Sequence, residues 1–536
     1  MKKVIKTLAI RTLIAGGIAA GLLIFSLCHY VGAEEWEEVV PNGFGEPSND
    51  YAWSMATFRG KLYVGTLNSN RGAEIWSSSS GEVDTWERVY NTLTTSNLGI
   101  RCMYADEDRF LYACTSNVAG TEVMRTEDGY RWTTVGRKGL GDMRNSSIRC
   151  ILRFGEYLYA GTGSKMAKLY RSKDGSAWEL IDAQPGFETT IVNYPRTRIG
   201  VTNNILIGEL AVFKNQLYAF TWTDDFTAIR GPFSRSMPKD PFLRAPNKTS
   251  VVQNSDDGNL VESIYGIWTR RSTKPEFSRA PGAFEVWRSS DGLNWEKVVG
   301  QDDAYGNGMG FSGHDPENLA NDLVTSVAVF NEKLYLGTMN GDGKTSVWRT
   351  SNGTSWEKVL DFFKMGEEYN FYIWRMIPFN GRLFIGTMNM GSEHDPGVTG
   401  AQIWASDSGD ADSFYCLVHN GFGSGSIRVA GISMPKNYGI RSFGILNNTL
   451  FVGTATMLSI AMPGPPFGVS IAGRKTGCEI WKLSENDQYS SVPSSLPVPT
   501  GDSQLPVEGN QSPAGRRGTG DHSFWWRVSG TKSVKQ

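Results

Sequence analysis

The sequence predicts an all-β fold: a seven-bladed β-propeller of four-stranded antiparallel blades, the last blade closed by the N-terminal strand. A strand–loop–strand–turn–strand pattern recurs about seven times, and each end of the chain carries part of one incomplete copy. The composition agrees, because 61 Gly and 17 Trp in 536 residues suit an all-β repeat protein with many turns. The net charge of −2 leaves no bulk attraction to nucleic acid.

The copy at Leu334–Leu360 shows the repeat most fully. Its first part, Leu334–Thr338, has the period-two alternation of a strand whose two faces see different surroundings. A second strand, Ser346–Thr350, leads into the turn Ser351–Gly353, where Asn and Gly favour a tight hairpin. The third strand is Trp356–Leu360.

A fourth, innermost strand at Thr325–Phe330 precedes this copy. The strand after it recurs seven times: LYVGT at Leu62, LYACT at Leu111, LYAGT at Leu158, LYAFT at Leu217, LYLGT at Leu334, LFIGT at Leu383 and LFVGT at Leu450. The next strand also recurs: AEIW ending at Trp76, TEVM at Met124, AKLY at Tyr170, FEVW at Trp287, TSVW at Trp348, AQIW at Trp404 and CEIW at Trp481. An outermost strand follows six of these: WERV from Trp86, WTTV from Trp132, WELI from Trp178, WEKV from Trp295 and Trp356, and FYCLV from Phe414.

The seventh copy lacks its outermost strand, since CEIWKL runs directly into the polar stretch Ser484–Asp487. The missing strand lies at the other end of the chain, where Trp36–Val40 reads WEEVV. If this strand completes the last blade, both ends of the chain are held in one sheet and no blade has an open edge. We therefore expect the propeller to span residues 34–485, with a long insertion at 222–282.

Residues 1–33 have the pattern of an export signal, with basic residues, an apolar run from Leu13 to Cys28 and small residues ending at Ala33. The run is shorter than the roughly 20 residues that a membrane-spanning helix needs. We predict cleavage after Ala33, with an uncleaved membrane anchor as the alternative, and a secreted or cell-surface location. Residues 486–536 are dominated by Pro, Ser, Gly and Gln, which predicts a disordered tail.

Five cysteines follow the predicted signal, and their spacing matches no zinc motif. Cys102 and Cys150 hold equivalent positions in the repeat, and Cys114 lies across a predicted hairpin from Cys102. One disulfide within this trio and a set of buried free thiols are both open alternatives.

The turn before the outermost strand reads SSDGLNW at 289–295, TEDGYRW at 126–132 and SKDGSAW at 172–178, with Asn352 in place of Asp in a fourth copy. These turns resemble the Asp-box, or bacterial neuraminidase repeat, of sialidases and many other exported propellers. They depart from the usual form by lacking one residue between Asp and Gly. In that family the box is a structural turn on the outer part of a blade, so the resemblance implies a fold and not an activity.

Sialidases in that family hold a carboxylate with three arginines and use a tyrosine nucleophile with a glutamate, together with an aspartate acid. This set has no residue-by-residue match here, the Arg-Ile-Pro stretch is absent, and seven blades differ from the usual six. Whether the chain is an enzyme therefore stays open.

The long connections, at residues 183–207, 222–282, 300–323, 388–400 and 455–477, are all expected at one end of the central channel, which we call the loop-rich face. Loops on a rigid scaffold commonly carry function. The innermost strands begin at this face, and four arginines and a glutamate lie near their starts: Arg101, Arg149, Glu209, Arg375 and Arg441. Converging guanidinium groups suit a carboxylate, phosphate or sulfate. Alternatively, each arginine pairs with a carboxylate or carbonyl of the neighbouring blade.

Two identical tripeptides, His314-Asp315-Pro316 and His394-Asp395-Pro396, lie in connections of the same face. A His beside an Asp can ligate a metal or act as acid and base, whereas Asp-Pro is also a turn signal. The acidic pairs Asp224-Asp225 and Asp256-Asp257 add oxygen ligands. Calcium is therefore the one cofactor that the sequence suggests, although the spacing matches no known calcium loop.

Two classes of function remain. In the first, an exported propeller, which we expect to be a monomer, binds an extracellular glycan or another anionic ligand at its loop-rich face without altering it. In the second, the same face is a sialidase-like hydrolase or lyase site for glycans, with the arginines holding a carboxylate. We favour the first, because the box is structural and the sialidase set is absent. Any membrane contact would run through an uncleaved N-terminal segment.

Overall fold

The computed structural model describes residues 35–163, 167–181, 187, 189–193, 199–223, 284–300, 305, 321–340, 344–389, 400–429, 432–456 and 477–483. The regular structure of these residues is antiparallel β-strand, with two short 3-10 helices, η1 (Lys138–Gly141) and η4 (Gly421–Gly423). Among them, no helix has the length and apolar character needed to cross a membrane.

Most strands pair with their neighbours in the chain in groups of four. The first three groups are β2 (Tyr51–Phe58) to β5 (Glu87–Asn91), with β3 (Lys61–Leu67) and β4 (Glu74–Ser78); β6 (Gly99–Asp106) to β9 (Thr133–Val135), with β7 (Phe110–Ser116) and β8 (Val123–Thr126); and β10 (Ser147–Phe154) to β13 (Glu179–Leu180), with β11 (Tyr157–Gly163) and β12 (Lys168–Ser172).

The next three groups follow the same order. They are β15 (Ile199–Phe213) to β18 (Glu296–Val299), with β16 (Gln216–Thr223) and β17 (Val286–Ser289); β19 (Asn321–Phe330) to β22 (Glu357–Asp361), with β20 (Lys333–Asn340) and β21 (Ser346–Thr350); and β23 (Asn370–Phe379) to β26 (Tyr415–Val418), with β24 (Arg382–Asn389) and β25 (Ile403–Ser406).

The final group combines both ends of the described chain. It consists of β29 (Asn437–Leu446), β30 (Thr449–Thr456), β31 (Ile480–Leu483) and β1 (Trp36–Val40). In the last pair, Trp36 lies opposite Leu483 and Val40 opposite Ile480. The expected pairing of the N-terminal strand with the CEIWKL strand is therefore present.

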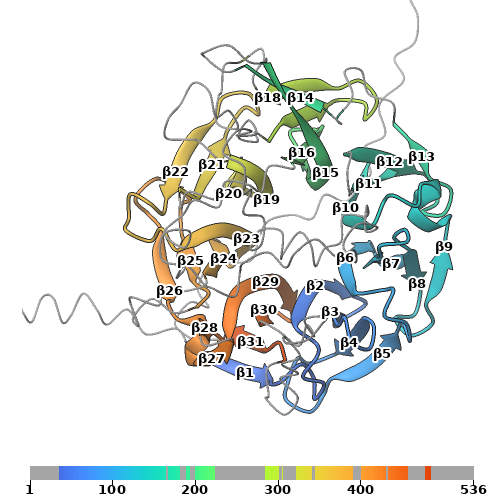
Figure 1. Cartoon of the computed structure of the whole chain (residues 1–536), viewed down its shortest axis with the longest axis vertical. Coiled ribbons are helices and arrows are strands. Elements are labelled where there is room, and N and C mark those ends of the chain that lie inside the picture. Colours follow the sequence, from blue (N-terminus) through green and yellow to red (C-terminus); the bar gives the residue numbers. More distant parts are fainter. Residues whose placement is uncertain are drawn as a thin grey trace, which may run out of the picture. The chain divides into compact units, whose positions relative to one another are not determined.

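Each group also pairs with the next, through its second strand and the first strand of its neighbour: β3 with β6, β7 with β10, β11 with β15, β16 with β19, β20 with β23, β24 with β29 and β30 with β2. The last of these pairs, Tyr51 with Ala455, returns to the first group. The result is a closed, antiparallel, propeller-like arrangement in which the first strand of each group lies nearest the centre (Figure 1).

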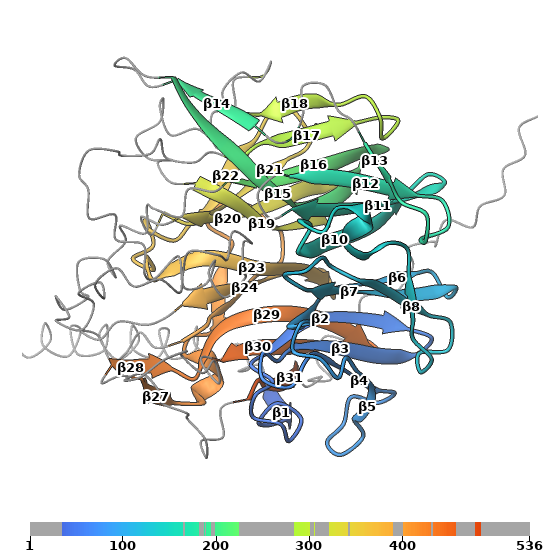
Figure 2. The same ribbon diagram turned by 45° about the vertical axis from the view of Figure 1, so that its right-hand side comes forward.

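Three further strands lie outside these groups. β14 (Thr189–Asn193) pairs with the early part of β15, and β27 (Ser426–Val429) forms a hairpin with β28 (Ile432–Pro435). Both belong to connections between groups, and Figure 2 shows them on the same side of the ring. This is the loop-rich face. Most of the expected insertion at 222–282 lies outside the described residues.

The glycine of the recurring LYxGT motif is explained by contact between groups. A Cβ added to Gly65 would lie 2.5 Å from the Cβ of Ile100 in the next inner strand, and one on Gly337 would lie 2.5 Å from a methyl of Ile373. Neither glycine has a positive φ, so close approach, and not backbone conformation, excludes a larger residue there.

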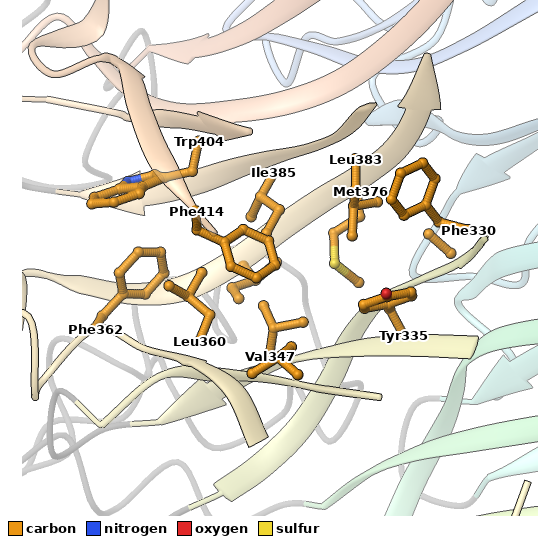
Figure 3. Packing of buried hydrophobic residues seen from close by; sticks show 13 residues of the cluster. Phe330, Tyr335, Val347, Leu360, Phe362, Met376, Leu383, Ile385, Trp404 and Phe414 are labelled. Atoms are coloured by element: carbon orange, nitrogen blue, oxygen red, sulfur yellow. The ribbon is translucent and has the colours of Figure 1, made fainter. Parts of the chain in front are cut away.

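The apolar core lies between neighbouring groups and not within one of them. Figure 3 shows the cluster between β19–β22 and β23–β26, in which Tyr335 and Val347 from one group meet Leu383, Ile385 and others from the next. All four named residues are fully buried. At roughly 1.5–3 kcal/mol for each large apolar side chain removed from water, such clusters make adjacent groups depend on each other.

A buried polar network recurs at the start of the third strand of several groups. Glu285 accepts hydrogen bonds from the indole of Trp287 (3.1 Å) and from the amide of Asn204 (2.8 Å), and it pairs with Lys297 at 2.8 Å. Glu74 is bonded in the same way by Trp76 and Asn49. Because a buried carboxylate is costly unless it is paired, these networks specify one register for each group.

The turns that resemble Asp-boxes share one set of hydrogen bonds. In the turn after β17, Ser289 Oγ accepts from Gly292 N (2.8 Å), and Asp291 Oδ1 accepts from Leu293 N (2.8 Å) and Asn294 N (2.7 Å). The copy with Asn352 has the same bonds, from Thr354 N and Ser355 N. One acceptor oxygen at this position is therefore what the turn requires.

The five cysteines of the described residues are free thiols. Cys102 and Cys114 lie directly opposite each other on β6 and β7, as the hairpin predicts. Burial raises the pKa of the Cys114 thiol, with a further contribution from Cys102. Of the two alternatives, the structure corresponds to free thiols, which are buried except for that of Cys416.

Candidate functional site

The first strand of every group carries a β-bulge at the same position, near the loop-rich face. In each case one residue has no partner in the ladder with the second strand, as between Ala52 and Ser54 or between Ile440 and Ser442. The bulged residues, in ring order, are Trp53, Arg101, Arg149, Gly208, Thr325, Trp374 and Arg441. Bulges re-aim side chains and are common beside functional sites.

Glu209 connects two of the predicted arginines. It follows the bulge of β15, is 6% exposed, and lies 3.0 Å from Arg375 Nη1 of β23 and 3.9 Å from Arg149 Nη2 of β10. The strand between β15 and β23 in the ring, β19, has the small Thr325 at its bulge. The pair with Arg375 therefore crosses that position, whereas Arg149 comes from the group that precedes β15 in the ring.

Arg149 is 4% exposed and lies against an indole. Its guanidinium carbon is 3.8 Å from the centre of the Trp222 ring, and its Nε donates to the carbonyl of Gly208 at 3.3 Å. Neither Nη1 nor Nη2 has a hydrogen-bond partner among the described residues. Burial, first of all, lowers the pKa of this guanidinium.

Arg441 is 1% exposed and lies between two indoles. Its guanidinium carbon is 5.0 Å from the Trp374 ring centre and 5.8 Å from that of Trp53. Its Nε and Nη1 have no hydrogen-bond partner within the part of the chain that the structure describes. Burial, first of all, and the positive charges of Arg375 and Arg149 together lower the pKa of Arg441 to about 9.

Arg101 completes the set. Its guanidinium carbon lies 4.5 Å from the centre of the Trp53 ring. It is 6% exposed. Glycines make room for the indoles, because a side chain on Gly99 would overlap the ring of Trp53 and one on Gly439 would overlap that of Trp374. The guanidinium–indole contacts thus depend on small residues in the neighbouring strands.

Three buried tyrosines surround these arginines. The hydroxyls of Tyr51 and Tyr438 share a hydrogen bond, and Tyr372 packs with Trp374 in the same aromatic cluster. Burial raises the pKa of all three phenols, while Arg441 opposes that shift in each case. The phenols are therefore protonated at neutral pH and can donate hydrogen bonds.

The structure places the five residues that the sequence proposed for this face in two sets. Arg101 and Arg441 contact the same Trp53 ring, and Arg149 and Arg375 lie within ion-pair distance of Glu209. The other candidates, His314, Asp315, His394 and Asp395, lie outside the described residues. Within those residues no group of three or more His, Cys, Asp or Glu side chains is arranged to hold a metal ion.

The aromatic part of the site was not predicted. Trp53 and Trp374 occupy positions equivalent to the arginines, and this equivalence could have identified them. Tyr51 and Tyr372 each stand two residues before one of these Trp residues, so the same equivalence could have identified them. Trp222, at the end of β16, and Tyr438, near the start of β29, had no such signal. Their proximity depends on closure of the ring.

The sequence matches no protein-family model and no curated protein. Solved structures share features of the arrangement at low similarity. The extracellular domain of a hybrid two-component system from B. thetaiotaomicron is 11% identical, with a TM-score of 0.43 over 83% of this chain, which spans 39% of that one. The WD40 β-propeller domain of Doa1 is 10% identical (TM-score 0.40, 85% and 100% covered), and an inactive virginiamycin B lyase from Staphylococcus aureus is 8% identical (0.42, 84% and 99%). At these values the similarities say nothing about what this chain binds.

Proposed function

We propose that the chain is an exported or cell-surface, seven-bladed β-propeller that binds an anionic extracellular ligand, such as an acidic glycan, at the loop-rich mouth of its channel. The groups β2–β5 through β29–β1 are the blades of this proposal. The turns at Asp128, Asp174 and Asp291 are shortened Asp-boxes, and residues 1–33 are a cleaved signal or an anchor.

The observation that carries the proposal is Arg441, a buried guanidinium with two unpaired nitrogens between Trp53 and Trp374. A buried charge without a partner is costly. Bound anion would supply charge-assisted hydrogen bonds to it, each contributing roughly 1.5–3 kcal/mol. Arg375, whose side chain is 23% exposed, is the arginine of the set that reaches solvent.

The geometry supports binding better than glycan cleavage. The phenols near the arginines have raised pKa values, so they are not poised as nucleophiles. Glu209, the carboxylate within ion-pair distance of the arginines among the described residues, is already engaged by Arg149 and Arg375. A general acid or base needs a carboxyl that is free to exchange a proton with substrate.

A glycan array with acidic and neutral members, followed by mass analysis of the recovered glycans, tests this function. We expect retention of acidic glycans without any change in their mass, and loss of retention in Arg441→Gln. Arg131→Gln is the control, because it removes the same charge from an exposed side chain in the turn between β8 and β9. Shortened or unsaturated products would replace binding with catalysis, and retention independent of charge would reject the site.

A further inference from the structure

The charges at the channel mouth are unbalanced among the described residues. Four guanidinium groups, those of Arg101, Arg149, Arg375 and Arg441, meet one carboxylate within ion-pair distance, that of Glu209. Three of the arginines are at least nine-tenths buried. Asp50, which immediately precedes β2, carries a negative charge that raises the pKa of the phenols of Tyr51 and Tyr438.

The neutral neighbours do not remove this imbalance. Indole faces attract a cation by about 0.5–2 kcal/mol, which is less than the cost of burying an unpaired ion. The mutual repulsion is direct, because Arg149 and Arg375 both disfavour the charged form of Arg441. An occupant that carries a single negative charge would leave at least one buried guanidinium without a counter-charge.

The buried donors that have no hydrogen-bond partner among the described residues also come from different strands. Nη1 and Nη2 of Arg149 extend from β10, whereas Nε and Nη1 of Arg441 extend from β29. A planar carboxylate satisfies one guanidinium fork well. A tetrahedral group offers three oxygens pointing in different directions, which matches donors that belong to separate strands of a ring.

Building on the proposed function, we propose that the mouth is specific for a doubly charged tetrahedral oxyanion, the terminal phosphate of a monoester, over singly charged carboxylates and sulfate esters. Arg149 and Arg441 donate to its oxygens. The phenol of Tyr372 is a neutral donor beside them, because its ring lies 6.4 Å from that of Trp222, which contacts Arg149, and 5.5 Å from that of Trp374, which contacts Arg441. Phosphodiesters, with one charge per phosphate, are excluded by the same balance.

Methyl phosphate and methyl sulfate form the matched pair of probes, because they share shape and differ in charge. We expect calorimetric titration of the full mature chain at pH 7.5 to show methyl phosphate binding at least about tenfold more tightly than methyl sulfate, on the strength of one added charge-assisted interaction. Acetate is the carboxylate arm. Inorganic phosphate and glucose 6-phosphate show whether the free ion or a sugar ester is preferred.

The preference is expected to fade with acid. A phosphate monoester has a second pKa of about 6, so at pH 5 methyl phosphate carries nearly the same charge as methyl sulfate. The ratio of the two affinities then falls toward one. Methyl sulfate does not titrate in this range, so any change in Glu209, Asp50 or another protein group appears in both arms and cancels in the ratio.

Three results decide between the ideas. Equal affinity for the two esters at pH 7.5, or a ratio that does not change by pH 5, overturns the dianion inference and leaves anion binding in place. Failure of every anion to bind at millimolar concentration overturns both the dianion inference and the proposed anion binding. Arg441→Gln is expected to lower methyl phosphate affinity at least about tenfold, with Arg131→Gln unchanged, and the comparison of esters on the unmutated chain stands even if a variant does not fold.

Discussion

The residue at each bulge determines which side chain lies at the centre of the ring near the loop-rich face. Arg149 and Arg441 hold the same position on β10 and β29, yet Arg149 contacts one carboxylate and one indole whereas Arg441 contacts two indoles. Glu209 is placed one residue after the bulge of β15, next to Gly208, where a side chain would overlap the indole of Trp222. The carboxylate or indole that each guanidinium contacts therefore comes from another strand.

Removal of Glu209 and removal of Arg441 are expected to have opposite effects on stability. Glu209→Gln leaves Arg149 and Arg375 without their carboxylate and should lower the free energy of unfolding by about 3–5 kcal/mol, as for other broken buried pairs. Arg441→Gln removes a charge that has no carboxylate partner among the described residues, so stability should stay within about 1 kcal/mol or rise. Urea unfolding of both variants measures the difference.

Arg153→Gln is the internal reference for this comparison. Arg153 lies on β10, like Arg149, but it pairs with the buried Asp106 at 2.6 Å. If Arg441→Gln destabilises the protein as much as Arg153→Gln does, Arg441 is a structural staple and the anion site is rejected.

The sequence located the arginines but not their partners. Counting back from each LYxGT motif finds the bulge position, because the short turns keep that spacing nearly constant. It cannot show that Arg375 reaches Glu209, since the two residues are separated by 166 positions and meet through closure of the ring. Trp222 was missed for the same reason.

At the scale of elements, the turns between third and fourth strands depend on one carboxylate or amide oxygen. Backbone hydrogen bonds from Asn294 and Leu293 hold the pKa of Asp291 below its usual range, and those from Ala177 and Ser176 do the same for Asp174. A carboxyl with a lowered folded-state pKa stabilises the protein above its unfolded pKa, near 3.9, and loses that contribution as the pH falls through the folded value.

Changing Asp128, Asp174 and Asp291 together to Asn should therefore flatten the acid limb of the stability curve. The bonds are expected to survive, because Asn352 already makes them in a fourth turn. Between pH 7 and 5 the two proteins should keep a constant difference in melting temperature, and between pH 4 and 2 the unmutated protein should lose more. Parallel curves down to pH 2 would contradict a role for these carboxylates in acid stability.

The polar network of the third strands was not predicted, although part of it was visible. The recurring Glu-Ile-Trp and Glu-Val-Trp triplets place a carboxylate two residues before an indole on the same face of a strand, and the structure shows them bonded at Glu74, Glu285 and Glu479. The asparagine partners precede these residues by 25, 81 and 42 positions. No local spacing connects them, so only the folded group reveals the pair.

At the scale of the whole molecule, closure depends on β1. Val39 and Val40 are buried at 2% and 4% exposure within a cluster that includes residues of β3 and β30. Deleting residues 34–41 from a chain that begins at residue 34 exposes the edge of β31 and opens this cluster. We expect a lower and broader thermal transition by calorimetry and a greater tendency to associate through the free edge.

A full-length chain with Glu37→Gln is a suitable control, because Glu37 is half-exposed and its pairing with Lys482 lies on the surface of the same strand pair. Surface pairs of this kind contribute little. An unchanged melting curve in the deletion variant would show that the ring does not need its N-terminal strand.

The general arrangement could be predicted from the sequence because the same strand pattern recurs about seven times. Alternation in LYxGT, the turn residues and the incomplete copies at both ends predicted an all-β ring closed by Trp36–Val40, and the pairing with β31 is present. The extension of inner strands at the loop-rich face, such as β19 beginning at Asn321 instead of Thr325, was missed. Those added residues pair beyond the bulge, where the sequence loses its alternation.

The bulge has one more consequence, for how such a protein changes over time. A residue that has no partner in the ladder is not fixed by strand pairing, and in this single chain the position holds Trp, Arg, Gly and Thr. The ring thus carries one variable position seven times, each time on the first strand of a group. Natural or engineered substitutions at these positions can therefore change the side chains at the centre of the ring, while the rest of each group keeps its sequence.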